Sequence, residues 1–490
     1  MAAAAGLQSR GRKVVVIEAA ARPGGTIGSR REEGCLTETG PNSTLETTPL
    51  IGRLIDQAGM AAERIYASAA AKKRFVLRGG RLIPVPLTPP AFFATDLFSW
   101  RAKLALLREP FVRRAAANAD ETVAQFVRRR LGTEFLDYAI NPFVAGVYAG
   151  DPERLSVAAA FPRLIEIERK YGSLIRGQIL GAAERRRNPE KSKQAAPMLS
   201  FRDGMQSLTD ALAARLDHLL VSTRATRIRR DDQGRWEVAA EGANGPMHFL
   251  ARALVLSAPA SVAAGLVAPH AAAAARALDA IPYPPVASVA SAYERGDIAH
   301  ALDGFGFLVP EKEGRRILGT IFSSTLFENR APAGTVLLTT FVGGMRQPEI
   351  ARREDREIAA LVHDELASLL GIRAPARWSR VTRWERAIPQ YTPGHLERMA
   401  AVDAAERDLP GLFFCANYRG GKRRALARSP RVLAHERLSS AQGGIASKTG
   451  GLRRTTRTAW MYDSRSGSTL AVSAASCIRA RTAKWAISSP

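Results

Sequence analysis

Hydrophobic and polar positions alternate with different periods along this chain, and each change of period predicts an element. Residues 14–17 form a short apolar run, mostly β-branched, which predicts a strand buried on both faces. The Ala-rich stretch before it predicts a helix that ends at Gly11, and a second helix is expected over residues 49–58. Residues 73–86 consist of two β-type runs around a Gly-Gly turn, which predicts a hairpin.

The middle of the chain changes from helical to strand-like periodicity. Residues 89–187 have helical spacing, and residues 200–216 combine a glycine turn with an amphipathic helix. A three-stranded insertion is expected from strand-like runs at 219–228, 234–239 and 254–257. A sizeable antiparallel sheet is expected over residues 286–345, with a helix at 357–370 after it.

Aromatic side chains lie among cations at the start of the helical part. The apolar residues are Phe92, Phe93, Leu97, Phe98 and Trp100, and the cations are Arg101, Lys103 and Arg108. A helix at a membrane surface presents this combination to lipid headgroups, but a helical core with a solvated edge has the same composition. We slightly favour the core and keep peripheral membrane contact by residues 89–187 as the alternative.

Composition restricts the classes of protein that fit. The 490 residues can bury large cores and suggest two or three domains. The net charge is +25, of which residues 422–490 carry +12. Such a basic surface fits an anionic membrane or a polycarboxylate substrate, and an ordinary solvated surface equally well. Nucleic acid fits less well, because no base-stacking motif accompanies the charge.

The cysteines and histidines predict no metal site. Cys35, Cys415 and Cys477 are far apart, which excludes a disulfide framework or a cysteine zinc site and fits a reducing, cytoplasmic compartment. The seven histidines have no ligand spacing, so no catalytic residue is predicted among them. No stretch has the pattern of a signal peptide or a membrane span, so any membrane contact is expected to be peripheral, on the inner face of the cell membrane.

The strand at 14–17 and the residues after it carry the clearest chemistry. Glu18 closes the strand, where the acid of a dinucleotide-binding βαβ unit accepts hydrogen bonds from the adenosine ribose. Arg22, Gly24 and Gly25 follow, and a backbone without Cβ can lie close to a pyrophosphate. This pattern favours flavin binding over an ordinary buried strand. The glycine-rich turn that normally precedes such an acid is absent, so the parallel sheet is expected to lack its central first strand.

Several longer segments follow one another in a recognisable order. The most specific is NPFVAGVYAGDPERLS at 141–156, and the others are KKRFVLRGGRLIPVP, SFRDGMQSL, GFGFLVPEKEGRRILGTIFSS, TTFVGGMRQPE, WERAIPQYTPGH and LPGLFFCANYRGG. Over residues 5–421 the chain resembles the oxygen-dependent protoporphyrinogen oxidase family of the flavin amine-oxidase superfamily. The 141–156 segment disfavours a related amine oxidase or carotenoid desaturase.

The resemblance implies a mixed α/β fold, with a Rossmann-like FAD-binding domain, an inserted β-rich substrate domain and a helical domain. It implies six-electron oxidation of protoporphyrinogen IX to protoporphyrin IX in haem biosynthesis, with hydride passed to FAD and O2 as acceptor. Coproporphyrinogen III stays open as the substrate, and a homodimer stays open as the assembly. The FAD-binding domain is assigned to residues 1–70, 197–280 and 386–421, the substrate domain to 71–88 and 281–385, the helical domain to 89–196, and a disordered basic tail to 422–490.

The resemblance also assigns site residues. Those for the cofactor are Glu18, Ala19, Arg22, Gly24, Gly25, Thr26, Gly40, Pro41, Asn42, Ser43, Ala225 and Trp384. Those for the substrate are Gly146, Leu308, Ile321 and Phe341, for which an ordinary apolar core is the alternative. Phe341 and Leu308 are expected to sandwich pyrrole rings. Plant members place an arginine for a substrate propionate where this chain has Ile83, and Arg78 or Arg81 is the substitute considered.

Two departures from the family pattern affect this interpretation. The glycine-rich turn is missing, and Lys422 begins a basic stretch where a V-x-V-x-x-D segment is expected. We interpret the chain as truncated at its start and as continued in another reading frame after Gly421, with a natural basic tail as the alternative. An inactive remnant that binds no flavin therefore stays open beside the enzyme.

Overall fold

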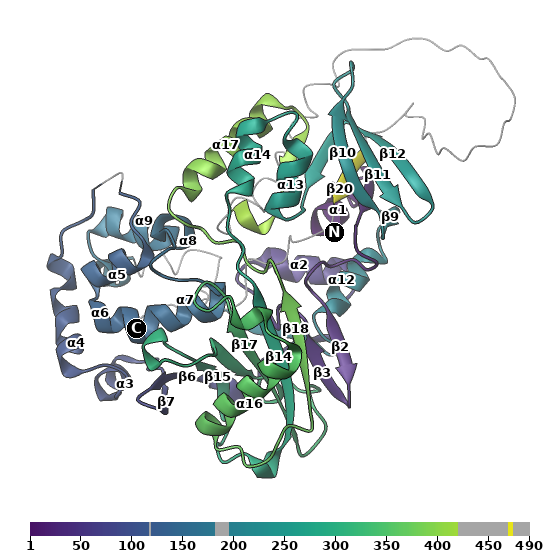
Figure 1. Ribbon diagram of the computed structural model, residues 1–490. Helices are drawn as coiled ribbons and strands as arrows, with labels where there is room; N and C mark the ends of the chain where they lie inside the picture. Colours follow the sequence, from purple (N-terminus) through teal and green to yellow (C-terminus); the bar gives the residue numbers. More distant parts are fainter. Residues whose placement is uncertain (117–118, 182–195, 420–468, 474–490) are drawn as a thin grey trace, which may run out of the picture. The chain divides into compact units, whose positions relative to one another are not determined.

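The computed structural model describes residues 1–116, 119–181, 196–419 and 469–473 (Figure 1). The chain divides into two compact units. Residues 1–25, 212–280 and 397–480 belong to the first unit, and residues 26–211, 281–396 and 481–490 to the second. Among the described residues, no helix has both the length and the apolarity needed to cross a bilayer.

The first unit is built on a five-stranded parallel sheet with the strand order β19-β13-β20-β1-β9. Its strands are β1 (Lys13–Ile17), β9 (Leu219–Leu220), β13 (Ala253–Leu256), β19 (Leu412–Phe414) and β20 (Thr469–Ser473). Its helices are α1 (Ala2–Gln8), α13 (Ala260–Val267), α14 (Ala272–Asp279) and most of α17 (His395–Asp408). Leu7 of α1 shares a buried core with Val14, Val16 and Val255, which confirms the first predicted helix and strand.

Strand β20 lies between β1 and β13 and pairs in parallel with both, with Val15 opposite Ala471 and Val255 opposite Val472. The structure therefore differs from the expectation of a missing central strand. It also differs from the expectation of disorder for residues 469–473, while the rest of 422–490 lies outside the described residues. The sequence TLAVS is a short apolar run of the kind found in central parallel strands. It lies within a strongly basic stretch, and that composition is the reason why disorder was expected there.

A three-stranded antiparallel sheet completes the first unit. It contains β10 (Arg224–Arg230), β11 (Trp236–Gly242) and β12 (Gly245–Ala251). The insertion is therefore confirmed, but the third strand predicted for it, at 254–257, is wrong, because that run forms β13 of the parallel sheet. Its continuous apolar sequence is typical of a strand buried on both faces, whereas β12 alternates between exposed and half-buried positions.

The second unit is built on a seven-stranded sheet with the order β18-β14-β17-β16-β15-β6-β7. Its strands are β6 (Lys73–Arg78), β7 (Arg81–Pro84), β14 (Val286–Glu294), β15 (Gly304–Leu308), β16 (Gly319–Phe322), β17 (Thr335–Gly343) and β18 (Trp378–Trp384). All neighbours are antiparallel except β15 and β6, which are parallel. The predicted hairpin and the predicted antiparallel sheet are both confirmed, and they belong to the same sheet.

One face of this sheet is covered by α16 (Asp355–Leu370), which confirms the helix predicted at 357–370 (Figure 1). Residues directly opposite in register share a face of a sheet. By that rule Phe75, Phe307 and Leu338 lie on the α16 face, and they are buried in one core with Val362 of the helix. The opposite face carries the predicted substrate residues.

Smaller elements complete the second unit outside its helical segment. Strands β2 (Ser29–Glu32) and β3 (Cys35–Glu38) form a hairpin, and β8 (Met198–Phe201) pairs with β4 (Thr44–Leu45) and β5 (Arg64–Tyr66). The helices are α2 (Pro49–Gln57), α15 (Ser323–Leu326), most of α12 (Gln206–Ala213), and the short turns η1 (Ala69–Lys72), η4 (Arg295–Asp297), η5 (Glu311–Glu313) and η6 (Ile350–Arg352).

The helical segment contains α3 (Pro89–Ala94), α4 (Trp100–Ala105), η2 (Leu106–Phe111), α5 (Val123–Arg130), α6 (Thr133–Phe135), η3 (Leu136–Ile140), α7 (Asn141–Tyr148), α8 (Val157–Ala160), α9 (Pro162–Tyr171) and α10 (Leu174–Leu180). Phe92 and Phe98 belong to its buried core, whereas Phe93 and Trp100 are exposed. Lys103 is buried and donates to the carbonyl oxygens of residues 93 and 95 at 2.8 and 2.7 Å. The core interpretation is therefore confirmed for Phe92 and Phe98, whereas Phe93 and Trp100 lie on the surface and membrane contact stays a prediction.

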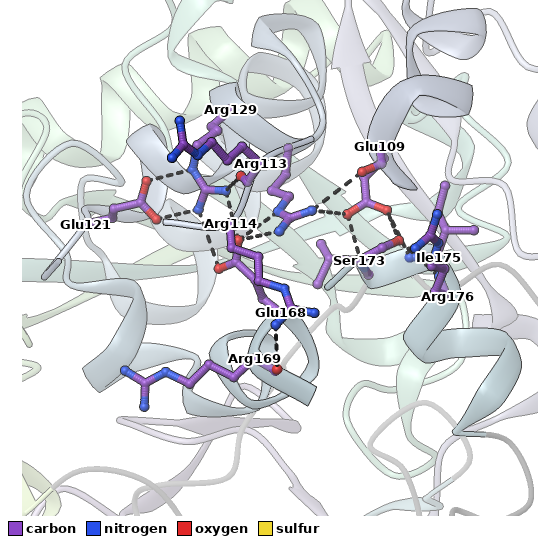
Figure 2. Close-up of polar contacts among 12 residues, drawn as sticks. Glu109, Arg113, Arg114, Glu121, Arg129, Glu168, Arg169, Ser173, Ile175 and Arg176 are labelled. Atoms are coloured by element: carbon purple, nitrogen blue, oxygen red, sulfur yellow. Dashed lines mark hydrogen bonds and ion pairs between the residues drawn. The ribbon is translucent and has the colours of Figure 1, made fainter. Parts of the chain in front are cut away.

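A buried network of arginine and glutamate side chains joins these helices (Figure 2). The Arg130 side chain is fully buried; its Nη1 donates to Glu109 at 3.0 Å and its Nε to Glu168 at 2.9 Å. Arg129 also donates to Glu168, at 2.8 Å. Glu109 accepts the backbone N–H of Leu174 at 2.8 Å, at the start of α10. These contacts fix η2, α5, α9 and α10 relative to one another.

Candidate functional site

Glu18 lies at the carboxyl end of β1 in the first unit and is buried. Its Oε1 accepts the backbone N–H of Ala20 at 2.9 Å, whereas its Oε2 has no hydrogen-bond partner among the described residues. Burial raises the pKa of this carboxyl, and the Ala20 N–H opposes the rise. A buried carboxylate oxygen needs a donor, and a ribose hydroxyl supplies one. Glu18 therefore fits the adenosine end of a flavin dinucleotide.

The segment after Glu18 turns tightly. Gly24 and Gly25 have φ angles of +102° and +61°, which side chains with a Cβ rarely adopt, so the turn requires glycine at both positions. Arg22 folds back over this turn and donates to the carbonyl oxygens of Pro23 and Gly25, each at 3.2 Å. An open glycine backbone beside an arginine is suited to the close approach of a diphosphate.

The other cofactor residues assigned by the resemblance are small or lie at the edge of their unit. Ala19 is exposed beside Glu18, and Ala225 is half-buried on β10, opposite Ala240 and next to a register shift. Thr26 is the first residue of the second unit. Small side chains at positions 19 and 225 leave surface that a planar ring could cover.

The loop Gly40–Ser43 follows β3 in the second unit. Trp384, the last residue of β18, donates its Nε1–H to the carbonyl oxygen of Thr39 at 2.8 Å. Asn42 donates its side-chain amide to the carbonyl oxygen of Gly40 at 3.3 Å. Within this unit the structure therefore brings together the two segments that the resemblance assigns to the flavin ring.

Three predicted substrate residues lie on one face of the seven-stranded sheet. By register, Leu308, Ile321 and Phe341 all point away from α16, and Trp384 shares their face. All four side chains are half-buried, whereas most large apolar side chains on the α16 face are buried. This face, called the substrate face below, therefore presents a row of partly accessible apolar side chains.

Helix α7 supplies the fourth predicted substrate residue, Gly146. A Cβ built on it would lie 2.3 Å from Cδ2 of Leu308, so helix and sheet approach closely here only because this residue is glycine. Ala145 of the same helix and Ala149, the residue directly after it, pack in one cluster with Phe341. Helix α7 therefore lies along the substrate face, and the structure brings all four predicted substrate residues together.

Arg74 is a cation on the substrate face that the sequence interpretation missed. It precedes Val76 by two residues on β6, and Val76 lies opposite both Leu308 and Ile83. The Arg74 side chain is half-buried, and burial lowers the pKa of its guanidinium. The alternation of KKRFVLR places Arg74 and Val76 on one face of the strand, but only the pairing of β6 with β15 shows that this is the face of Leu308.

The two arginines considered as substitutes are placed less favourably. Arg78 donates to Glu134 at 2.6 Å and lies over the Tyr138 ring at 4.4 Å. Arg81 is exposed, and Ile83 packs against the core of the helical segment. Arg78 is therefore committed to the helical segment, whereas Arg74 lies on the substrate face.

A small pocket lies between β3 and the substrate face. It is lined by Leu36, Glu38, Asn42, Ile321, Ser323, Leu326, Phe327, Arg330 and Thr339. Asn42, assigned to the flavin, and Ile321, assigned to the substrate, therefore share one pocket. Elsewhere in the described parts of the chain, no group of three or more His, Cys, Asp or Glu side chains is arranged to hold a metal ion.

Comparison with known proteins agrees with this geometry. Residues 1–423 match the family of flavin containing amine oxidoreductases. The chain is 37% identical over 433 residues to the chloroplastic protoporphyrinogen oxidase of Nicotiana tabacum, covering 83% of this chain and 78% of that protein. It is 30% identical over 434 residues to the coproporphyrinogen III oxidase of Propionibacterium freudenreichii subsp. freudenreichii, covering 81% and 80%. A crystal structure of a protein from Exiguobacterium sp. 255-15 has the same fold, with a TM-score of 0.72 at 22% identity over 90% of this chain and 96% of that chain.

Proposed function

Because this chain belongs to the protoporphyrinogen oxidase family of the flavin-containing amine oxidoreductases, we propose that it is an FAD-dependent porphyrinogen oxidase. The proposed reaction is the six-electron oxidation of protoporphyrinogen IX to protoporphyrin IX, in which each pair of electrons and protons reduces one O2 to H2O2. The observation that carries the proposal is the substrate face, where Leu308, Ile321 and Phe341 are aligned beside Gly146.

The apolar residues and the arginine of the substrate face would play different parts in binding the substrate. A large flat ligand needs apolar walls and few polar anchors. Phe341 and Leu308 would pack on the pyrrole rings, and Gly146 allows α7 to approach the sheet closely. Arg74 would bind a propionate carboxylate and so orient the macrocycle.

The flavin would supply the redox chemistry by accepting hydride at its N5. Glu18 would accept a hydrogen bond from the adenosine ribose, and the Gly24-Gly25 turn would lie along the diphosphate. The loop Gly40–Ser43 and Trp384 would border the ring.

Purification of the full chain with added FAD tests the proposal directly. Protoporphyrin fluorescence and O2 consumption are measured with protoporphyrinogen IX as substrate. Phe341→Ala should raise KM about five- to a hundredfold, because a lost aromatic contact is worth roughly 1–3 kcal/mol. Phe111→Ala, an exposed aromatic of the helical segment, is the matched control and should leave KM unchanged. A chain with flavin absorbance but no porphyrinogen turnover would exclude this function.

Coproporphyrinogen III is the alternative substrate, because proteins named for that activity also resemble the chain. It carries four propionates, against two on protoporphyrinogen IX, and so depends more on basic side chains. The ratio of kcat/KM for the two substrates decides between them. Arg74→Gln should lower kcat/KM for either substrate about tenfold or more, since a charge-assisted hydrogen bond is worth roughly 1.5–3 kcal/mol.

We also propose that the helical segment docks on an anionic membrane, on the cytoplasmic side. Trp100, Leu104, Leu107 and Phe111 follow α4 and η2 at helical spacing, so they share one side, and they are 57–81% exposed. Arg176 of α10 lies over the Phe111 ring at 6.0 Å. Exposed apolar side chains with cations beside them are typical of helices that bind lipid interfaces.

Co-sedimentation with vesicles tests the docking. Phosphatidylcholine vesicles with and without phosphatidylglycerol are compared, and binding is expected only with the anionic lipid. Replacing Leu104, Leu107 and Phe111 by Ser should abolish it, whereas Val262→Ser, which alters an exposed apolar residue of α13, should not. Phe92 and Phe98 are unsuitable targets because both are buried. Full binding by the triple variant would refute the docking surface.

A further inference from the structure

The pocket beside the substrate face contains a buried arginine whose hydrogen-bonding capacity is only partly used. Arg330 follows α15 and is 3% exposed. Its Nη2 donates to Ser200 Oγ at 2.6 Å, and its guanidinium lies 5.4 Å from the centre of the Phe327 ring. Its Nη1 has no hydrogen-bond partner among the described residues. A buried N–H group without an acceptor is costly, so this arginine fits an acceptor in the pocket.

Glu38 is the acidic neighbour of Arg330, but its oxygens are committed elsewhere. Ser29 Oγ donates to Oε2 at 2.6 Å and the Met205 N–H donates to Oε1 at 2.9 Å. Arg330 Nη2 is 3.5 Å from Oε1, longer than a good hydrogen bond. Gly204 has a φ angle of +93°, and a Cβ on it would lie 2.9 Å from Oε1 of Glu38. Glycine at this position therefore leaves space for the carboxyl group. The carboxyl and Arg330 therefore form a buried ion pair without a good hydrogen bond between them.

The charge of the pocket depends on pH. Burial raises the pKa of Glu38 to about 7, although Arg330, Ser29 and the Met205 N–H oppose the rise. The remaining charged groups that act on Arg330 are Arg31 on β2 and Asp203 after β8, which pair with each other at 3.3 Å on the surface. Once Glu38 is protonated, the pocket holds the uncompensated charge of Arg330.

The rest of the pocket lining offers donors. The Asn42 side-chain amide has a single contact, to a carbonyl oxygen at 3.3 Å, and an amide carries two N–H groups. Ser323 and Thr339 share one hydrogen bond at 2.8 Å, which leaves one hydroxyl hydrogen to donate. Apart from Glu38, none of the described residues that line the pocket is acidic.

We propose that this pocket binds a small monovalent anion such as chloride, held by Arg330 and taken up together with a proton on Glu38. The site goes beyond the proposed oxidase activity, because its ligand is neither flavin nor porphyrinogen. Asn42 and Ile321 line the same pocket, so binding of an anion there would also make the substrate face sensitive to salt concentration and pH.

Thermal unfolding of the full chain, without added flavin or porphyrinogen, tests the site. Sodium chloride and sodium gluconate are compared at equal ionic strength, because gluconate is too large for the pocket, at about pH 6 and about pH 8.5. A ligand that binds only the folded state raises its stability by mass action. The wild type should be stabilised by chloride over gluconate, with an apparent dissociation constant about tenfold lower at pH 6.

Three variants make the expectation specific. Arg330→Met should lose the chloride effect at both pH values. Glu38→Gln should keep it at both, because glutamine mimics the protonated acid. Arg128→Met, which removes an exposed arginine paired with Glu153, is the matched control and should behave as the wild type.

The same experiment can overturn the proposal. Equal stability of the wild type in the two salts at pH 6 would do so, as would an undiminished chloride effect in Arg330→Met. If Arg330→Met does not fold, the line width of the chloride-35 NMR signal, measured with the wild type and with Glu38→Gln, tests the site instead. Line broadening by the wild type should then be stronger at pH 6 than at pH 8.5 and independent of pH in Glu38→Gln, and any other pattern refutes the site. Since no step uses flavin or substrate, failure here is distinct from failure of the oxidase assignment.

Discussion

The two oxygens of the Glu18 carboxylate differ in their surroundings, and this difference makes a prediction. Oε1 accepts a backbone N–H, whereas Oε2 is buried without a partner in the described structure. Glu18→Leu should therefore weaken FAD binding about ten- to a hundredfold, because a hydrogen bond to a charged group is worth roughly 1.5–3 kcal/mol. Fluorescence titration of FAD measures the affinity, with Glu63→Leu as an exposed control. Unchanged affinity for FAD in Glu18→Leu would show that Glu18 makes no hydrogen bond to the cofactor.

Glu38 makes a second prediction at the scale of one residue, because its pKa is raised to about 7 by burial. The folded chain then holds this proton more tightly than the unfolded chain, so the stability that the residue contributes is complete below about pH 4.5 and is lost as pH rises through about 7. Glu38→Gln should remove that loss, which is on the order of 3 kcal/mol. Urea unfolding across this pH range checks it. An identical slope in the variant would show that Glu38 does not titrate as its surroundings imply.

Among the elements, the helical segment depends on the network around Arg130. Its guanidinium is fully buried between Glu109 and Glu168, so its removal leaves the buried Glu109 without its cation within the described residues and leaves Glu168 with Arg129 alone. Arg130→Met should cost about 3–5 kcal/mol, the usual effect of breaking a buried ion pair from one side. Hydrogen exchange should report lost protection in η2 and α10, which the network joins. Arg128→Met removes only a surface pair and should cost less than about 1 kcal/mol.

The strands also show which features of the fold the sequence pattern could predict and which it could not. Alternation predicted the sheet over 286–345, because one buried face is visible in every second residue. It could not predict that β6 joins that sheet by pairing with β15, since the two strands are distant in sequence. Arg74 was missed for this reason, because a cation on a strand matters only once the face of the whole sheet is known. Glu38 and Arg330 meet through another long-range contact, in which the Leu36 N–H of β3 donates to the Arg330 carbonyl oxygen at 2.9 Å, and no local spacing could reveal it.

Across the whole molecule, strand β20 supplies the last prediction. It pairs with β1 on one side and β13 on the other, so both strands depend on residues 469–473 for their inner hydrogen bonds. A chain ended after residue 423 would leave two parallel strands with unpaired edges, and each buried backbone group without a partner costs roughly 1–3 kcal/mol. Hydrogen exchange should then show lost protection at 13–17 and 253–256, while β14 and β17 in the second unit keep theirs.

A point variant separates this effect from the loss of the basic residues around β20. Ala471→Pro keeps the charge but removes one backbone N–H from the strand, so it should reduce protection of β1 and β13 in the same direction. Substitution of basic residues 453 and 454 by Gln should change neither strand, because it leaves the backbone of 469–473 intact. If the chain ended after residue 423 keeps full protection at β1 and β13, then β20 does not hold this sheet together in solution, and the two strands must satisfy their inner edges by another pairing.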